Sequence, residues 1–182
     1  MSEKNQAVTW ETAAEWIGKE LPPNRSVDEM NKTWIRWWLE VIEFDCPLHY
    51  DEEVARQYGH KGIIAPVAMT ISAALPPYWD YGDAHTTMQD PPKLAPFEGA
   101  RIPSPGKRNF ATDYEFEFYE DLEPGDTVYS VAKLTEIKPK KLRVGDGAFL
   151  TMEKTYRSTE QKLLAIGRNT IFKFDVAEEA EA

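Results

Sequence analysis

Residues 43–51 read Glu43-Phe44-Asp45-Cys46-Pro47-Leu48-His49-Tyr50-Asp51, and residues 62–66 read Gly62-Ile63-Ile64-Ala65-Pro66. Pro47 stiffens a turn that carries His49, and Asp51 is a residue typical of a helix N-cap. The second segment is apolar and ends in a proline, which suits the first position of a helix. This order predicts a helix end, a turn with a histidine, a short capped helix and a junction that leads into a further helix.

Two helices are expected before this turn. The first runs from about Trp10 to Ile17, with Thr9 as its N-cap. The second begins at a capping box, in which the Ser26 hydroxyl and the Glu29 carboxylate accept hydrogen bonds from otherwise unpaired backbone N–H groups. Apolar residues then recur at three- and four-residue steps, which predicts one broad apolar face. Those residues are Met30, Trp34, Trp37, Trp38, Val41 and Ile42.

Two more helices are expected after the turn. Asp51 caps a short one that ends at Gly59. The other runs from about Pro66 to Leu75 and consists almost entirely of apolar or small residues. A helix that is apolar on all sides is buried, so other elements must surround this one.

The surrounding elements are predicted to be strands. Residues 110–119 alternate between two sets of side chains with a period of two, and strand-like runs follow near 127–137, 148–158 and 162–174. An apolar helix followed by an antiparallel sheet of four to six strands is an α+β layout.

The connections between these strands are short. Pro124 and Gly125 suit a type II turn between the first two strands, and Thr159-Glu160-Gln161 joins the last two. Gly145 and Gly147 are assigned to a hairpin turn, because no lysine and helix follow them as in a phosphate-binding loop. We therefore expect an antiparallel meander.

The chain is expected to contain one domain, at residues 26–174. Residues 1–25 form an N-terminal extension with a short helix, and residues 175–182 form an acidic tail. Residues 76–108 hold seven of the thirteen prolines. A loop of this length inside a compact domain is usually functional or mobile.

Composition narrows the classes of partner. The net charge of −10 argues against nucleic acid and against a membrane surface, since both favour a basic face. No stretch has the length and apolarity of a membrane span or the pattern of a signal peptide, and the single cysteine suits a reducing compartment, so a cytoplasmic protein is expected. His60 and His85 stand apart from any cluster of cysteine, histidine and carboxylate residues, so no metal and no cofactor are assigned.

The order of these features resembles the MaoC-like dehydratases, hot-dog-fold proteins that add water to acyl thioesters or remove it. The resemblance covers about residues 26–174 and is greatest to the N-terminal-type domain of that family, in which the acid–base pair is often incomplete. It implies a hot-dog fold, with an antiparallel sheet wrapped around the apolar helix. It rests on Pro47-Leu48-His49, Ala55 with Gly59, Ile64-Ala65-Pro66 and Pro124-Gly125-Asp126.

The resemblance also indicates catalytic candidates. Catalytic members carry the motif Asp-x-Asn-Pro-(Leu or Ile)-His, and its aspartate and histidine act on one water. This sequence keeps Pro47 and His49, but Phe44 stands at the aspartate position and Cys46 at the asparagine position. Asp45 follows one residue late. His49 and Asp45 are therefore the catalytic candidates, and their structural alternatives are a hydrogen-bonded histidine and an Asx turn.

Substrate-binding candidates come from the same resemblance. In catalytic members a glycine N–H at the start of the buried helix holds the thioester carbonyl. In this sequence that glycine falls on or beside Pro66, so Ala65, Pro66 and Val67 are the candidates. Pro66 has no N–H to donate. Tyr78 and Trp79 could cover an acyl pocket, or they could pack on the core or on a second subunit.

The resemblance implies a hydratase or dehydratase subunit of fatty acid or steroid metabolism. It would add water reversibly to a 2-enoyl-thioester of coenzyme A or an acyl carrier to give a 3-hydroxyacyl-thioester. The incomplete motif implies a second hot-dog subunit, in a homodimer or in a heteromer with a catalytic MaoC-like chain. The alternative is a non-catalytic acyl-thioester-binding or structural subunit. A basic cluster could hold coenzyme A phosphates or form a solvated turn; it comprises Lys138, Lys140, Lys141 and Arg143.

Overall fold

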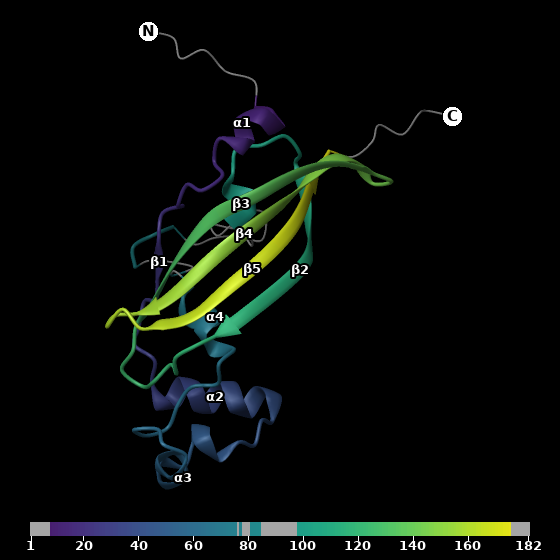
Figure 1. Ribbon diagram of the computed structural model, residues 1–182. Coiled ribbons are helices and arrows are strands. Elements are labelled where there is room, and N and C mark those ends of the chain that lie inside the picture. Colours follow the sequence, from purple (N-terminus) through teal and green to yellow (C-terminus); the bar gives the residue numbers. More distant parts are fainter. Residues whose placement is uncertain (1–7, 76, 78–80, 85–97, 176–182) are drawn as a thin grey trace.

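The computed structural model describes residues 8–75, 77, 81–84 and 98–175. Within these ranges one antiparallel sheet has the strand order β1-β3-β4-β5-β2, and α2 and α3 lie beyond one end of it while α1 lies at the other (Figure 1). This arrangement confirms the expected α+β hot-dog class. The strands are β1 (Asn24–Arg25), β2 (Arg108–Phe118), β3 (Val128–Leu142), β4 (Gly145–Ser158) and β5 (Leu163–Phe174).

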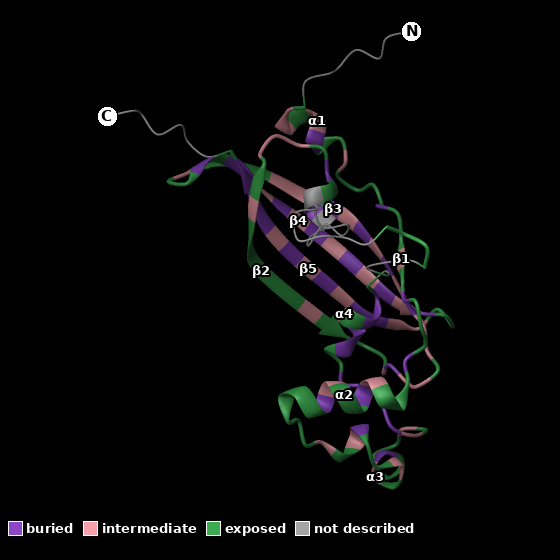
Figure 2. Cartoon of the chain, turned by 180° about the vertical axis from the view of Figure 1, so that it is seen from behind, coloured by how far each residue is buried: buried purple, intermediate pink, exposed green. Residues whose placement is uncertain are grey.

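One face of the sheet carries a row of ion pairs across four strands. Lys133 of β3 and Arg168 of β5 both bind the Glu153 carboxylate of β4, at 2.8 and 3.2 Å. Arg168 also reaches Glu117 of β2 at 2.5 Å. Side chains along a strand alternate between the two faces of the sheet. The strand residues next to these ion-paired residues therefore belong to the opposite, inner face. Figure 2 shows this alternation as bands of buried and less buried residues along β3, β4 and β5.

The inner face contributes to two hydrophobic clusters. One forms around α2 and α4, and we call it the α4 cluster; it contains Met30, Ile35, Leu39, Ile63, Ala65, Met69, Ala73, Ala74, Leu122, Val128, Tyr156, Leu164 and Ala165. The other includes residues of α1 and of the segment after η2, and we call it the α1 cluster. It contains Ala13, Leu21, Ile102, Ala132, Leu134, Ala148, Leu150, Met152 and Ile171.

The helices are short apart from one. Their bounds are α1 (Trp10–Ala14), α2 (Lys32–Ile42), η1 (Pro47–His49), α3 (Glu52–Gln57), α4 (Met69–Ala73) and η2 (Glu98–Arg101). The predicted caps at Thr9 and Asp51 are confirmed, since Thr9 accepts from the N–H of Thr12 and Asp51 accepts from the N–H groups of Glu53 and Val54. α1 nevertheless ends at Ala14, earlier than the predicted Ile17.

The predicted capping box at Ser26 and Glu29 is wrong. α2 begins at Lys32, and its N-cap is Asn31, whose side chain accepts from the N–H of Trp34 at 2.9 Å. Ser26 is instead buried beside β3, where its hydroxyl accepts from the N–H of Val128 at 3.0 Å. The pattern of a hydroxyl followed by a glutamate does not distinguish a helix cap from a strand contact.

The helix expected from Pro66 to Leu75 is shorter than predicted. Residues 67–68 form a turn, in which the N–H of Met69 bonds to the Pro66 carbonyl at 2.8 Å, and only Met69–Ala73 is α-helical. Met69, Thr70 and Ala73 are buried, whereas Val67 and Leu75 are about half exposed. The residues of this segment are almost all apolar or small, but the segment is buried on one side only.

The predicted meander is also wrong at its first connection. β2 pairs with β5, so the chain between β2 and β3 crosses to the far side of the sheet. The turn inside this crossover is as expected, because the N–H of Asp126 bonds to the Glu123 carbonyl at 3.0 Å and Gly125 has a φ of 99°. Side chains that alternate with a period of two predict a strand, but they do not show which other strand pairs with it.

The two remaining connections are hairpins, as predicted. β3 and β4 join through residues 143–144, and Gly145 begins β4. β4 and β5 join through residues 159–162, where the N–H of Ser158 bonds to the Lys162 carbonyl at 3.0 Å. In the described ranges, no helix is long and apolar enough to cross a membrane.

Candidate active site

His49 ends the short helix η1 and is 8% exposed. Its Nδ1 lies 2.8 Å from the backbone carbonyl oxygen of Ile64. Because a carbonyl oxygen only accepts, Nδ1 carries the proton and donates it, which leaves Nε2 of the neutral ring as an acceptor. The Phe44 ring packs beside the imidazole, with 5.6 Å between the ring centres. The turn therefore holds His49 in one orientation and one tautomer.

Asp45 precedes the same turn but makes a different contact. The Tyr50 hydroxyl donates a hydrogen bond to its carboxylate. This hydrogen bond raises the pKa of the Tyr50 hydroxyl. Both side chains are exposed. Asp45 is close to His49 in the sequence, but its carboxylate is not buried with the imidazole.

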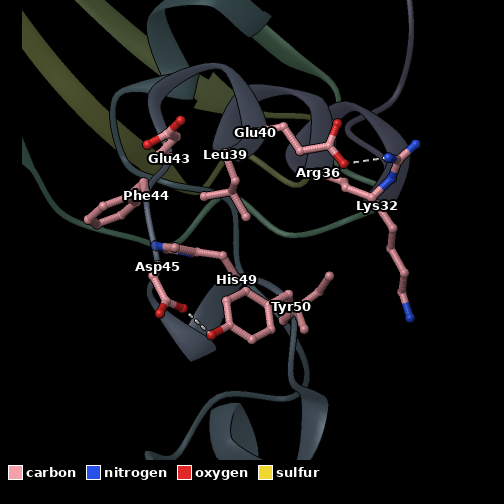
Figure 3. Close-up of a pocket in the computed structure, with 10 residues that line it drawn as sticks. Lys32, Arg36, Leu39, Glu40, Glu43, Phe44, Asp45, His49 and Tyr50 are labelled. Carbon is pink, nitrogen blue, oxygen red and sulfur yellow. Dashed lines mark hydrogen bonds and ion pairs between the residues drawn. The ribbon is translucent and has the colours of Figure 1, made fainter.

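A cavity of about 520 Å³ opens beside these residues. Figure 3 shows Asp45 and Tyr50 on one side of the His49 ring, and Arg36 and Glu40 of α2 beyond Leu39 on the other. The cavity thus contains both predicted catalytic residues. Its lining consists of Lys32, Arg36, Leu39, Glu40, Glu43, Phe44, Asp45, His49, Tyr50 and Ile63.

The predicted substrate-binding residues are only partly connected to this cavity. Ala65 is buried, and its N–H donates to the Leu122 carbonyl at 2.7 Å, so that group is not available to a ligand. Neither Ala65, Pro66 nor Val67 lines the cavity, although Ile63 does. Tyr78 and Trp79 lie outside the described residues, as does His85.

The contribution of α2 to the cavity wall was not predicted from the sequence. α2 was interpreted only through its apolar face, yet Lys32, Arg36 and Glu40 project from its polar side toward the cavity. Arg36 pairs with Glu40 across one helical turn at 2.5 Å, and Lys32 pairs with Glu52 of α3. In the sequence, Lys32, Arg36 and Glu40 recur every four residues, but this spacing of charged residues does not by itself indicate a cavity.

Two other predicted features lie away from this site. His60 is not isolated as expected, because its Nδ1 lies 2.7 Å from a carboxylate oxygen of Asp121. The basic cluster of residues 138–143 lies at the β3–β4 hairpin, at the opposite end of the sheet from α3 (Figure 1). Within the described part of the chain, no group of three or more histidine, cysteine or carboxylate residues could hold a metal ion.

This fold is found in solved structures of the MaoC-like class. A MaoC-like dehydratase from Rhodospirillum rubrum is 17% identical with a TM-score of 0.56, over 86% of this chain and 92% of that one. A chain of the ChsH1–ChsH2 complex from Mycobacterium tuberculosis is 27% identical with a TM-score of 0.68, over 94% of this chain and 93% of that one. The class is therefore that of the hot-dog MaoC-like dehydratases.

Within that class, the chain belongs to the family described as the FAS1-like dehydratase domain region, whose model matches residues 15–166. A relative from Thermomonospora curvata named "Probable enoyl-CoA hydratase alpha subunit" is 32% identical over 164 residues, which is 87% of this chain and 50% of the relative. The "3-oxo-4,17-pregnadiene-20-carboxyl-CoA hydratase alpha subunit" of Mycobacterium tuberculosis is 30% identical over 129 residues, 70% of this chain and 40% of the relative. The chain spans about half the length of these curated relatives or less.

Proposed function

We propose that this chain is a subunit of a MaoC-like hydro-lyase that adds water reversibly to a 2-enoyl-thioester to give a 3-hydroxyacyl-thioester. The observation that carries the proposal is the buried His49, whose Nδ1 is held by the Ile64 carbonyl at the wall of a cavity. Its Nε2 is then in the form that takes a proton from water, which is the role of a general base in hydration. The names of both curated relatives, enoyl-CoA and steroid-type acyl-CoA hydratase alpha subunits, support this reaction class.

The chain lacks two other groups that hydration needs. Phe44 replaces the aspartate of the catalytic motif, and Asp45 is hydrogen-bonded to the exposed Tyr50. Pro66 offers no N–H to the developing oxyanion. Loss of one oxyanion donor typically lowers turnover by about 10²–10³-fold, and loss of an acid or base by about 10²–10⁴-fold. A chain with these deficits would hydrate its substrate very slowly.

We therefore propose that a second hot-dog subunit supplies the complete aspartate and histidine pair. The solved relative with 27% identity is a complex of two different chains, and both curated relatives are named as alpha subunits, which supports a pair. In such a pair, His49 and Asp45 contact the reacting end of the thioester from this side. Ala65, Pro66 and Val67 line the acyl group. The thioester carrier is coenzyme A or a carrier protein.

A second candidate is a non-catalytic subunit that binds the acyl thioester or only supports its partner. The specific observation that favours it is Phe44, which packs against the His49 ring where the motif has a carboxylate. An aromatic ring at this place gives His49 no partner for acid–base chemistry on this side.

Hydration of crotonyl-coenzyme A by the purified chain distinguishes the two candidates. We expect slow turnover that falls by about 10²-fold in His49→Ala, as for loss of a general base. His60→Ala is the matched control, since His60 is a second partly buried histidine outside the cavity, and we expect its turnover to stay within about twofold. Binding of crotonyl-coenzyme A without turnover, and with no rescue by a partner chain, would favour the non-catalytic subunit. Absence of both would contradict the proposed function.

A further inference from the structure

A second cavity, of about 350 Å³, lies beside α3, and we call it the α3 cavity. Among the described residues that line it, three are cations and two are carboxylates. They are Lys32, Arg56 and Lys61, and Glu52 and Glu123. The wall of the α3 cavity therefore carries an excess of one positive charge, although the chain has a net charge of −10. A local reversal of the sign of charge favours an anionic ligand.

The cations of the α3 cavity share their carboxylates. Each carboxylate binds two cations, Lys32 and Arg56 at Glu52, and Lys61 and Lys162 at Glu123. The Lys61 pair is long, at 3.9 Å, and the side chains of Lys32, Arg56 and Lys61 are 63%, 58% and 83% exposed. Exposed ion pairs of this kind contribute little to stability, so an anionic ligand can join or replace these carboxylates at low cost.

The α3 cavity adjoins the cavity beside His49, since Lys32 and Ile63 line both. Lys32 is the first residue of α2, and Leu39 lies near His49 on the same helix. A helix rises about 1.5 Å per residue, so Lys32 lies about 10 Å from Leu39 along α2. Figure 3 shows Lys32 at the end of α2 remote from Asp45. An extended pantetheine arm, with its two amide groups, is long enough to cover this distance from a thioester beside His49.

We propose that Lys32, Arg56 and Lys61 bind a phosphate of the thioester carrier in the α3 cavity. This inference rests on the proposed function and adds the place where the carrier is held. Arginine binds phosphate through paired N–H groups, and lysine binds it as a compact positive charge. A phosphate joined to pantetheine is common to coenzyme A and to acyl carrier proteins, so the same site serves either carrier.

The position of the other basic cluster, residues 138–143, argues against it as the phosphate site of the same ligand. It lies at the β3–β4 hairpin, at the opposite end of the sheet from α3 (Figure 1). β3 runs from Val128, which packs in the α4 cluster with α2, to Leu142 at the hairpin. At about 3.3 Å per residue this strand is about 45 Å long, which is more than a pantetheine arm spans.

Binding of three non-reactive ligands tests the inference without catalysis. They are octanoyl-pantetheine, octanoyl-4′-phosphopantetheine and octanoyl-coenzyme A, compared by calorimetry on the purified chain. At low ionic strength we expect octanoyl-coenzyme A to bind at least about tenfold more tightly than octanoyl-pantetheine, since one hydrogen bond to a charged group is worth about a factor of ten. The difference should shrink at high ionic strength, because salt screens exposed charges.

The phosphopantetheine ligand distinguishes the two sources of phosphate. If it binds as tightly as octanoyl-coenzyme A, the site holds the phosphate that coenzyme A shares with carrier proteins. If only octanoyl-coenzyme A gains affinity, the site holds the nucleotide phosphates and the carrier is coenzyme A.

Substitutions on α3 and beside it should change the affinity in opposite directions. Glu52→Gln removes the carboxylate that competes for Lys32 and Arg56, so octanoyl-coenzyme A should bind at least about threefold more tightly. Arg56→Gln and Lys61→Gln should each weaken its binding by at least about threefold. Octanoyl-pantetheine should bind all three variants as it binds the wild type, which a general loss of structure would not allow.

Lys140→Gln, in the hairpin cluster, is the matched control and should keep the wild-type preference. Equal binding of octanoyl-coenzyme A and octanoyl-pantetheine would overturn the inference and leave the proposed function intact. So would a preference that is unchanged in Arg56→Gln and Lys61→Gln, or one that Lys140→Gln abolishes. Failure of all three ligands to bind would contradict the proposed function and the inference together.

Discussion

At the scale of single residues, the site depends on how one turn orients His49. Pro47 begins η1, and the hydrogen bond from Nδ1 to the Ile64 carbonyl fixes the ring. The same turn directs Asp45 to Tyr50. A shift of one position along the chain has therefore separated the carboxylate from the imidazole, and Phe44 occupies the place beside the ring.

Restoring the motif aspartate tests this interpretation. Phe44 is 45% exposed, so Phe44→Asp should fold, and it places a carboxylate beside His49. We expect crotonyl-coenzyme A hydration by the isolated chain to rise at least about tenfold, because a positioned acid or base contributes about 10²–10⁴-fold. Phe44→Asn is the matched control and should show no rise. A folded Phe44→Asp variant with wild-type turnover would show that the turn, and not the missing carboxylate, limits the chemistry.

At the scale of elements, β1 is joined to β3 by a buried side chain. The Ser26 hydroxyl accepts from the N–H of Val128, and the Ser26 N–H donates to the Val128 carbonyl at 2.7 Å. Ser26→Ala leaves a buried N–H without its acceptor, so we expect the free energy of unfolding to fall by roughly 1–2 kcal/mol in urea denaturation. Ser158→Ala is the control, because the Ser158 hydroxyl has no hydrogen-bond partner among the described residues, and its effect should stay within about 0.5 kcal/mol. Equal losses in the two variants would contradict the assigned contact.

The row of ion pairs on the outer face gives the sheet a dependence on pH. The hydrogen bond from Lys133 lowers the pKa of the Glu153 carboxyl, and Arg168 adds to this effect. A lowered native pKa contributes stability above the ordinary glutamate pKa, and this contribution is lost as the pH falls through the native value. We expect Glu153→Gln to lower the melting temperature at neutral pH and to lose less on further acidification than the wild type. Glu115→Gln, which belongs to none of the described ion pairs, should follow the wild-type curve; a Glu153→Gln curve parallel to the wild type would contradict the assignment.

At the scale of the whole molecule, the helices and strands were predicted from the sequence better than the pairing of one strand with another. Asp51 and the Pro124-Gly125 turn were assigned correctly because their roles depend on local backbone geometry. The pairing of β2 with β5 could not be inferred, since alternation in β2 is compatible with any neighbour. His49 was identified through its motif, but the charged side of α2 was not, because only the fold brings Arg36 to the cavity.

The sheet also presents an open edge. β2 is the last strand in the order, and its aromatic residues Phe110, Tyr114 and Phe118 are 40–53% exposed. Exposed edge strands with apolar side chains are hazards that proteins cover. This edge is consistent with the proposal that a second hot-dog subunit completes the molecule.

The central claim is that this chain needs a second hot-dog subunit to hydrate its substrate efficiently. The most direct measurement compares crotonyl-coenzyme A hydration by the isolated chain with that of its mixture with a hot-dog chain that carries the intact Asp-x-Asn-Pro-(Leu or Ile)-His motif and is encoded beside it. We predict that the mixture exceeds the sum of the two separate chains by at least about 10²-fold, the effect of supplying an acid–base group or an oxyanion donor. Full turnover by the isolated chain, unchanged by the partner, would contradict this claim.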